Sequence, residues 1–430
     1  MVEPLASWEE PARHPVRADS RARRLAARWL LPVAAPPIER GAILIDPNGL
    51  IEAVGPDAAV PRPYGVPSQD LGDAFLIPGL INTHTHLELT GFEGQVEDQE
   101  FSAWIQHLRQ LKTTRDSSEY LHAARRGLAD CYAAGVTLIA DTGSSGAAIQ
   151  VLSEAGGAGV AYQEAFGPDP AQVERSLAEL QDNVHRSSRF ATGRLRIGVS
   201  PHAPYTVSGP LFRAVARWAR SEDLPLAVHL AESPAEVQFL VAGTGPFAQA
   251  WRARGIPLPI SRGQTPVAWL SSHEVLSEWS LCIHAVQVGP ADIQRLADAG
   301  AAVAHCPLSN RIHGHGAAPL AALLSAGIRV GLGTDSVASV GRLDLLAEAR
   351  AARALADLSP VEALELCTLG GAHALGLASE TGSLTVGKWG DCTVIRPPAA
   401  TGAPAELVLA TSPADVLATY VGGREVYRAL

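Results

Sequence analysis

Eight short β-rich runs alternate with longer stretches rich in Ala, Leu and Arg along the middle of this chain. The runs lie at 75–86, 135–143, 159–167, 194–204, 224–233, 280–288, 301–310 and 327–336. Strands that alternate with helical stretches favour parallel β/α organisation. Eight such units close most economically into a barrel, so the sequence predicts an α/β fold of the (β/α)₈ TIM-barrel type.

The alternative for the same alternation is an open, doubly wound sheet. A dinucleotide-binding sheet of that kind would carry G-x-G-x-x-G after its first strand, and this sequence has none there. Polar residues instead follow nearly every predicted strand. Because a barrel places its active site at the C-terminal ends of its strands, this distribution favours the barrel.

The two ends of the chain differ from the middle. Residues 23–75 contain Pro47-Asn48-Gly49 between two β-branched runs, as in a hairpin, and residues 381–430 are also rich in strands and turns. Neither segment is long enough to bury a core alone. We therefore expect both segments to form one small, split β-sandwich domain beside a catalytic barrel of residues 76–380, with 1–22 as an N-terminal extension.

Composition and charge limit the partners. The formal net charge of -10 argues against nucleic acid, and no apolar run approaches the roughly 20 residues that span a bilayer. The N-terminus is acidic where a secretory signal would be basic, and the five cysteines are scattered without a C-x-x-C pair. These features predict a cytoplasmic protein with a small-molecule substrate and no membrane partner, and leave association into a homo-oligomer open.

His84 and His86 stand two residues apart at the end of the first predicted strand. Residues i and i+2 of a strand point to one face, so both imidazoles would project together. Taken alone, the pair would fit an incidental polar turn equally well. Three more strand ends carry His229, His284 and Asp335, however, and together these groups predict a metal site with nitrogen and oxygen ligands. One divalent ion per chain is expected, Zn²⁺ in the first place and Fe²⁺ as the alternative.

Glu232 follows His229 by three residues, in "HLAE". A metal can supply hydroxide by lowering the pKa of a bound water to about 7, but expelling an amine also needs a proton donor at the leaving nitrogen. Glu232 stands just beyond the strand end, within reach of such a site. The alternative is a surface glutamate at the start of a helix.

The motifs "PGLINTHTH", "HLAE", "HAVQV", "HCPLSN" and "GLGTDSVAS" occur in that order. As a set, over residues 23–430, they resemble the amidohydrolase superfamily in its metal-dependent branch of cytosine-, guanine-, S-adenosylhomocysteine- and aminodeoxyfutalosine-deaminase-like enzymes and chlorohydrolases. The resemblance implies that His84, His86, His229 and Asp335 bind the metal. It also implies catalytic roles for Asp335, which takes a proton from the water, for His284, which hydrogen-bonds that water, and for Glu232, which shuttles the proton.

Lys112 and Lys388 are the only lysines, and neither lies near the fourth predicted strand in the sequence. Binuclear members of the superfamily bridge two metals through a carboxylated lysine at that strand. The resemblance therefore implies a site with one metal, which disfavours dihydroorotase, hydantoinase and phosphotriesterase activities.

Further polar residues follow the same strands and are the expected substrate-binding residues: Glu88, His202, Tyr205, His305, Ser309 and Asn310. By resemblance, His202 and His305 contact the ribose or purine part of a nucleoside-like substrate. The pattern "HTHLELTGF" is closest to the aminodeoxyfutalosine deaminases. The expected function is deamination of a purine- or nucleoside-like molecule through metal-bound hydroxide, with aminodeoxyfutalosine among the candidates. A chlorohydrolase or cyclic-amide hydrolase, and more remotely a non-catalytic scaffold, are the alternatives.

Overall fold

A computed structural model describes residues 22–97, 100–259 and 263–429. The expected N-terminal extension lies, except for Ala22, outside the described residues. Within them, no helix is both long enough and apolar enough to cross a membrane. All five cysteines are buried and unpaired.

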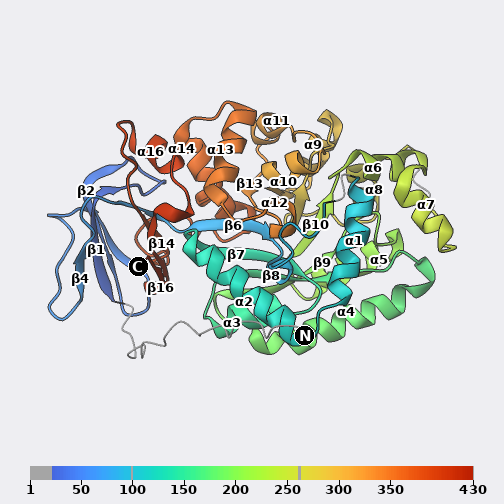
Figure 1. Ribbon diagram of the computed structural model, residues 1–430, viewed down its shortest axis with the longest axis horizontal. Helices are drawn as coiled ribbons and strands as arrows, with labels where there is room; N and C mark the ends of the chain where they lie inside the picture. Colours follow the sequence, from blue (N-terminus) through green and yellow to red (C-terminus); the bar gives the residue numbers. More distant parts are fainter. Residues whose placement is uncertain (1–21, 98–99, 260–262, 430) are drawn as a thin grey trace, which may run out of the picture.

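Eight parallel strands form the predicted barrel, in the order of the sequence (Figure 1). They are β6 (Leu80–Thr85), β7 (Val136–Gly143), β8 (Gly159–Ala165), β9 (Leu195–Pro201), β10 (Leu226–Leu230), β11 (Ser280–His284), β12 (Ala302–His305) and β13 (Val330–Leu332). Nearly every residue of these strands is buried, because helices cover the outer face and side chains fill the interior. The barrel fold is thereby confirmed.

The barrel closes between its first and last strands through a few specific bonds. The Asn82 side chain exchanges two hydrogen bonds with Thr334, donating to its Oγ1 (2.8 Å) and accepting from its backbone N–H (3.1 Å). Next to this pair, the Asp335 N–H donates to the carbonyl of His84 at 3.0 Å. The seam of the barrel therefore brings two of the predicted site residues side by side.

Helices follow the strands and surround the barrel. They are α1 (Phe101–Thr113), α2 (Ser117–Ala133), α3 (Ala147–Glu154), α4 (Val173–Ser187), α5 (Gly209–Ser221), α6 (Pro234–Val237), α7 (Gly245–Ala253), α8 (Pro266–Ser272), α9 (Pro290–Asp298), α10 (Pro307–Ile312), α11 (Leu320–Ser325), α12 (Val337–Val340), α13 (Leu345–Ala356), α14 (Pro360–Leu366), α15 (Leu369–Ala374) and α16 (Pro404–Leu409). Short 3₁₀ helices occur at Leu87–Leu89, Pro170–Gln172, Ser188–Phe190 and Pro413–Asp415, and a π-helical turn at Gln238–Ala242.

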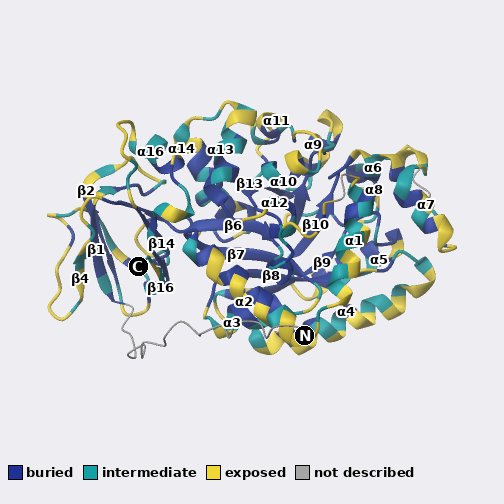
Figure 2. Cartoon of the chain, viewed as in Figure 1, coloured by how far each residue is buried: buried dark blue, intermediate teal, exposed yellow. Residues whose placement is uncertain are grey.

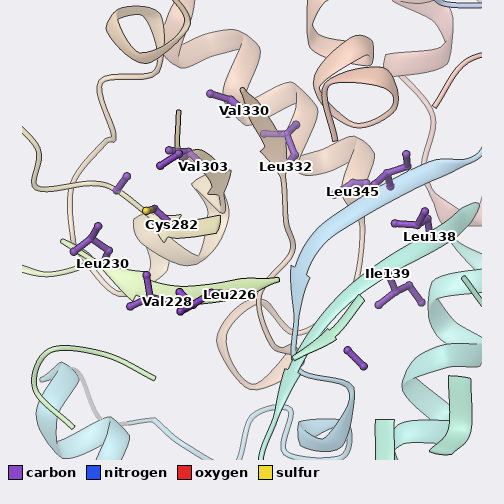
Figure 3. Close-up of a cluster of buried hydrophobic side chains, with 14 of the residues drawn as sticks. Leu138, Ile139, Leu226, Val228, Leu230, Cys282, Val303, Val330, Leu332 and Leu345 are labelled. Carbon is purple, nitrogen blue, oxygen red and sulfur yellow. The ribbon is translucent and has the colours of Figure 1, made fainter. Parts of the chain in front are cut away.

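The main core lies between the strands and this layer of helices. Figure 2 shows buried strands inside and exposed residues along the outer faces of helices such as α2 and α4. Figure 3 shows part of this core, with Leu138 of β7, Val228 of β10, Val303 of β12 and Leu345 of α13 among its side chains. Burying such aliphatic side chains stabilises the fold by about 1.5–3 kcal/mol each. This packing supports the strands whose ends carry the predicted site residues.

The two ends of the chain meet in a second sheet (Figure 1). Its strands are β1 (Arg23–Leu30), β2 (Ile38–Ile45), β3 (Ile51–Pro56), β4 (Ser68–Asp70), β5 (Phe75–Pro78), β14 (Cys392–Ile395), β15 (Val416–Val421) and β16 (Arg424–Arg428). The order is β16-β15-β14-β5-β1-β2-β3, with β4 beside β1. Residues of both chain ends, among them Leu30, Ile43, Val394 and Tyr420, share one core. This is the small β-sandwich that we expected, whereas its exact domain boundaries stay predictions.

The prediction of one continuous first strand over residues 75–86 is wrong. The structure divides it at Gly79 into β5, which pairs with β1 and β14 of the small sheet, and β6, which begins the barrel. A Cβ at Gly79 would lie 2.0 Å from the Thr137 hydroxyl, so the chain crosses between the two sheets where a side chain has no room. The sequence pattern predicted one strand because the segments on both sides of Gly79 are apolar. The end of the 301–310 run also differs, since α10 begins at Pro307.

Candidate functional site

Strained backbone turns end three of the strands at the mouth of the barrel. Ala231 after β10 (φ 50°), His284 and Ala285 at the end of β11 (φ 74° and 47°) and Asp335 after β13 (φ 58°) are left-handed without being glycine. Such residues cost on the order of 1–3 kcal/mol each and cluster at functional sites. These turns lie at the open end of the barrel, where they help to position the side chains of Glu232, His284 and Asp335.

Three histidines from two strands converge there. One ring nitrogen from each of His84, His86 and His229 lies within 4.8 Å of the others. Oδ1 of Asp335 is 3.6 Å from Nε2 of both His84 and His86. All four predicted ligands therefore meet at one point, although they come from β6, β10 and β13.

This cluster fits a divalent metal. A separation of 3.6 Å is too long for a hydrogen bond, but two ligands about 2.1 Å from a tetrahedral ion stand roughly 3.4 Å apart. Both ring nitrogens of buried His84 lack a hydrogen-bond partner among the described residues. Burial lowers the pKa of His84 to about 4, which leaves the neutral imidazole that a metal requires.

Neighbouring groups orient the cluster. Nδ1 of His229 lies 3.2 Å from the carbonyl of His202, and Nδ1 of His86 lies 3.2 Å from the hydroxyl of Thr142. Partners of this kind fix which ring nitrogen faces a metal. The hydroxyl of Ser309 donates to Oδ2 of Asp335 at 2.6 Å, so Oδ1 stays turned toward the histidines.

Glu232 lies beside the histidines and is held from two directions. Tyr205 donates its hydroxyl to Oε2 at 3.2 Å, while Nε2 of His315 and of His284 lie 3.4 and 3.6 Å from Oε1. Its backbone N–H, like that of Ala231, donates to the buried carboxyl group of Glu236 at 2.9 Å. Burial alone would raise the pKa of Glu232, but His284 and His315 lower it to about 2.

His284 is itself fixed by Asn310. Its Nδ1 lies 2.9 Å from Oδ1 of Asn310, an acceptor, so Nδ1 carries a proton and Nε2 faces Glu232 and the cluster. Two carboxylates and the imidazole of His284 thus surround one potential metal position, an arrangement that suits metal-assisted hydrolysis.

A cavity of about 580 Å³ opens above this position. Helix α1 contributes Phe101 and Trp104 to its wall, and α7 contributes Phe247 and Trp251. The metal-binding candidates His86, His229 and Asp335 form part of its floor. Its size and its mixture of aromatic walls with a polar floor suit a small heteroaromatic molecule.

The structure separates the predicted substrate-binding residues into two groups. His202 and Tyr205 line the cavity. The other four are buried and do not line it: Glu88, His305, Ser309 and Asn310. Ser309 and Asn310 instead contact Asp335 and His284, as described above. Both ring nitrogens of His305 lack a hydrogen-bond partner among the described residues.

Several residues of the site were missed from the sequence. His313 and Glu164 line the cavity, and His315 contacts Glu232. Two signals were present. Glu164 follows the same strand-end rule as the predicted ligands, and His313 and His315 repeat the H-x-H spacing in "HGHG".

Lys112 also reaches the cavity, although it is far from the fourth strand in sequence. Its Nζ donates to Oε1 of Glu88 at 2.9 Å and to the hydroxyl of Ser144 at 3.0 Å. Burial alone would lower the pKa of Lys112, but Glu88 raises it above the ordinary value. The side chain is therefore an ammonium ion, whereas carboxylation requires a neutral amine.

Comparison with known proteins agrees with the fold and with the family that the motifs resemble. The model described as "Amidohydrolase family" matches residues 75–426. A 5-methylthioadenosine/S-adenosylhomocysteine deaminase of Moorella thermoacetica is 30% identical over 413 residues, covering 92% of this chain and 91% of the relative. An aminodeoxyfutalosine deaminase of Deinococcus radiodurans is 30% identical over 343 residues, covering 76% and 79%.

A solved structure is similar over nearly the whole chain. The zinc-bound crystal structure of an adenosine deaminase from Xanthomonas campestris superposes with a TM-score of 0.80 at 25% identity, covering 94% of this chain and 92% of that one. The chain belongs to the amidohydrolase family, as its motifs suggested.

Proposed function

We propose that this protein is a metal-dependent aminohydrolase with one metal per chain, which deaminates a purine- or nucleoside-like small molecule. The observation that carries the proposal is the position of Glu232, a fully buried carboxylate held beside the histidine cluster by Tyr205, His284 and His315. A hydrolase that only had to activate water would not need a second, independently held carboxylate. Expulsion of ammonia from a ring does need one, because the leaving nitrogen must be protonated.

We assign His84, His86, His229 and Asp335 as the metal ligands, and zinc as the metal. Three imidazoles with one carboxylate suit zinc, and the adenosine deaminase of similar fold has bound zinc. When bound, the ion would lower the pKa of a water molecule in the cavity toward neutrality. Asp335 accepts a proton from that water, and Nε2 of His284 orients it through a hydrogen bond.

Glu232 then carries the proton. Its low pKa makes it a carboxylate in the resting site, so it can accept one of the two protons of the water and deliver it to the ring nitrogen. The second proton, which Asp335 accepts, goes to the departing amine. The aromatic walls from α1 and α7 hold the ring and exclude water. We further propose that the protein works in the cytoplasm, consistent with its unpaired cysteines.

The names of the relatives and the resemblance of the motifs suggest the substrates to be tested first. Zinc-loaded protein is assayed for ammonia release from adenosine, 5′-methylthioadenosine, S-adenosylhomocysteine, aminodeoxyfutalosine, guanine and cytosine. Chloride release from a chlorinated triazine tests the alternative hydrolysis. Rapid chloride release without any ammonia release would contradict the proposal.

Two variants separate the proton shuttle from the metal. Glu232→Gln should keep the metal, because the four ligands are untouched, and should lose about 10²–10⁴-fold in kcat. His229→Gln should lose metal and activity together. A Glu232→Gln enzyme within tenfold of the wild type would exclude the proposed proton transfer.

A further inference from the structure

Glu236 is a buried carboxyl group next to the site that has no task in the proposed reaction. It belongs to α6, its residue is 0% exposed, and it does not line the cavity. Oε1 accepts a hydrogen bond from the backbone N–H of Ala231, and Oε2 accepts one from the backbone N–H of Glu232, each at 2.9 Å. One side chain therefore holds two consecutive peptide groups, the second of which belongs to the proposed proton carrier.

The segment that Glu236 holds is the strained turn after β10. Ala231 has a φ of 50°, a left-handed conformation that a residue with a Cβ adopts only at a cost. Ala231 and Glu232 are both buried, so their N–H groups depend on acceptors within the protein. Consecutive N–H groups converge on one acceptor group in turns that contain a left-handed residue, whereas in an extended chain they point to opposite sides. The carboxyl group of Glu236 thus favours the strained conformation over an extended one.

The conformation of this turn sets the direction in which the Glu232 side chain leaves the backbone. The carbonyl of Ala231 accepts hydrogen bonds from the N–H groups of Val286 at 3.0 Å and Gln287 at 2.7 Å, which tie the turn to the chain beyond β11. Glu236 ties the N–H groups of the same turn to α6. A backbone rotation here would displace the proton carrier, and a displacement of about 1 Å can cost on the order of 10²-fold in rate.

Two simpler roles fit Glu236 less well. A cap for α6 is already provided by Ser233, whose hydroxyl accepts a hydrogen bond from the N–H of Glu236 at 3.3 Å. Direct proton transfer to a substrate would require a place in the cavity lining, which Glu236 does not have. Its carboxyl group is instead directed at the backbone of the turn.

We propose that Glu236 is a positioning residue for Glu232: it accepts the N–H groups of Ala231 and Glu232 and so holds the turn that directs the proton carrier toward the substrate. The inference rests on the proposed function, because Glu232 carries a proton in that reaction. Its consequence is that Glu236 affects turnover through Glu232, whereas substrate binding and metal affinity depend on Glu236 only weakly.

The test is a double-mutant cycle on the zinc-loaded protein, with the substrate that the ammonia assay identifies. Glu236→Gln keeps the size of the side chain, but its amide has one acceptor oxygen for two N–H groups. The variant should lower kcat about 10- to 100-fold, with KM and zinc content within about twofold of the wild type. In a Glu232→Gln background the same change should cost less than about threefold, because the group through which it acts is already lost.

A second substitution tests the role of the strained turn. Glycine adopts a φ of 50° without strain, so Ala231→Gly should recover part of the rate that Glu236→Gln loses. The control is Asp57→Asn, which removes a carboxylate that pairs with buried Arg24 in the small sheet. This control should lower the stability and leave kcat unchanged.

Hydrogen exchange, followed by mass spectrometry, gives an answer that needs no substrate. Glu236→Gln should speed the exchange of residues 226–233 about tenfold, since the loss of a hydrogen bond to a carboxyl group acts on that scale. Residues 159–165, which form β8 on another part of the barrel, should keep the wild-type rate.

An equal loss of rate from Glu236→Gln in both backgrounds, or no loss in the wild-type background, overturns the inference, and so does unchanged exchange of residues 226–233. If Glu236→Gln does not fold, the double variant with Ala231→Gly is used for the same comparisons. Failure of the proposed function is a separate result. A Glu232→Gln enzyme within about tenfold of the wild type would remove the proton transfer, while the exchange rates would still decide whether Glu236 holds the turn.

Discussion

Nε2 of His315 lies 3.4 Å from Oε1 of Glu232, and both side chains are buried. His315 sits between Gly314 and Gly316, which have φ of 67° and 102°. Its ring packs edge-on against Phe101, and its carbonyl accepts a hydrogen bond from Gln287. A left-handed glycine on each side lets the chain turn His315 inward, where it contacts Oε1 of Glu232 while Tyr205 contacts Oε2.

We therefore predict that His315 is a positioning residue for Glu232. His315→Phe keeps the packing against Phe101 but removes the contact with the carboxylate. It should lower kcat by about 10- to 100-fold with little change in KM or metal content, because it acts on proton transfer and not on binding. His315→Gln, which can still donate a hydrogen bond, should recover part of the rate. The control is His185→Phe on the exposed face of α4. A KM of His315→Phe that rose as much as its kcat fell would point to general structural damage.

Removal of the metal should destabilise the fold. The ligands come from β6, β10 and β13, so the ion joins distant parts of the barrel. A ligand present at about 1,000 times its Kd stabilises by roughly 4 kcal/mol. Dialysis against a chelator should therefore lower Tm by several degrees, and Zn²⁺ but not Mg²⁺ should restore it, since Mg²⁺ prefers oxygen ligands. Elemental analysis should find one tightly held ion per chain, and two would contradict the assigned site.

Ser309 should tune metal affinity without touching the metal. Its hydroxyl donates to Oδ2 of Asp335 at 2.6 Å. Ser309→Ala removes the hydrogen bond that holds Oδ2 of Asp335, and the loss of such an outer partner typically weakens metal binding about 10- to 100-fold. Competition with a chromophoric chelator measures the change. Ser325→Ala, at the exposed end of α11, is the control. An unchanged zinc affinity would show that the backbone N–H of Ser336 holds Asp335 sufficiently.

Asp391 joins the barrel to the small sheet. Its carboxylate accepts hydrogen bonds from Arg194 at 2.6 Å, Thr381 at 2.8 Å and the backbone N–H of Gly422 at 2.7 Å. Asp391→Ala leaves Arg194, whose side chain is 12% exposed, without an anion, and should cost about 3 kcal/mol. Asp73→Ala removes an exposed pair with Arg28 and should cost less than about 1 kcal/mol. Urea denaturation of both variants tests this contrast, and equal midpoints would refute it.

Glu88 should make the stability depend on pH. Burial alone would raise its pKa, but Lys112 at 2.9 Å lowers it from 4.5 to about 2. Because the folded pKa lies below the unfolded one, the carboxylate stabilises the fold above pH 4.5, and this contribution is lost as the pH falls toward 2. The difference in unfolding free energy between wild type and Glu88→Gln should therefore shrink between pH 6 and pH 3. A difference that stays constant over this range would argue against an ionised Glu88.

The sequence alone determined those features that depend on local repetition. Eight alternating β/α units can hardly pack otherwise than as a closed or a doubly wound sheet, and the ends of parallel strands necessarily meet at one edge. For this reason His84, His86, His229, His284 and Asp335 could be brought together before any coordinates were known. The tertiary structure places all five around one point.

Only the tertiary structure decided the contacts made by loops and by long side chains. Lys112 meets Glu88 across 24 positions, and His315 meets Glu232 across a whole βαβ unit. The tertiary structure also shows that Glu164 lines the cavity, whereas Glu88, Ser309 and Asn310 do not. The physical reason is that strand periodicity dictates which way a side chain leaves a sheet, whereas the path of a loop depends on packing between residues distant in sequence, which no local pattern records.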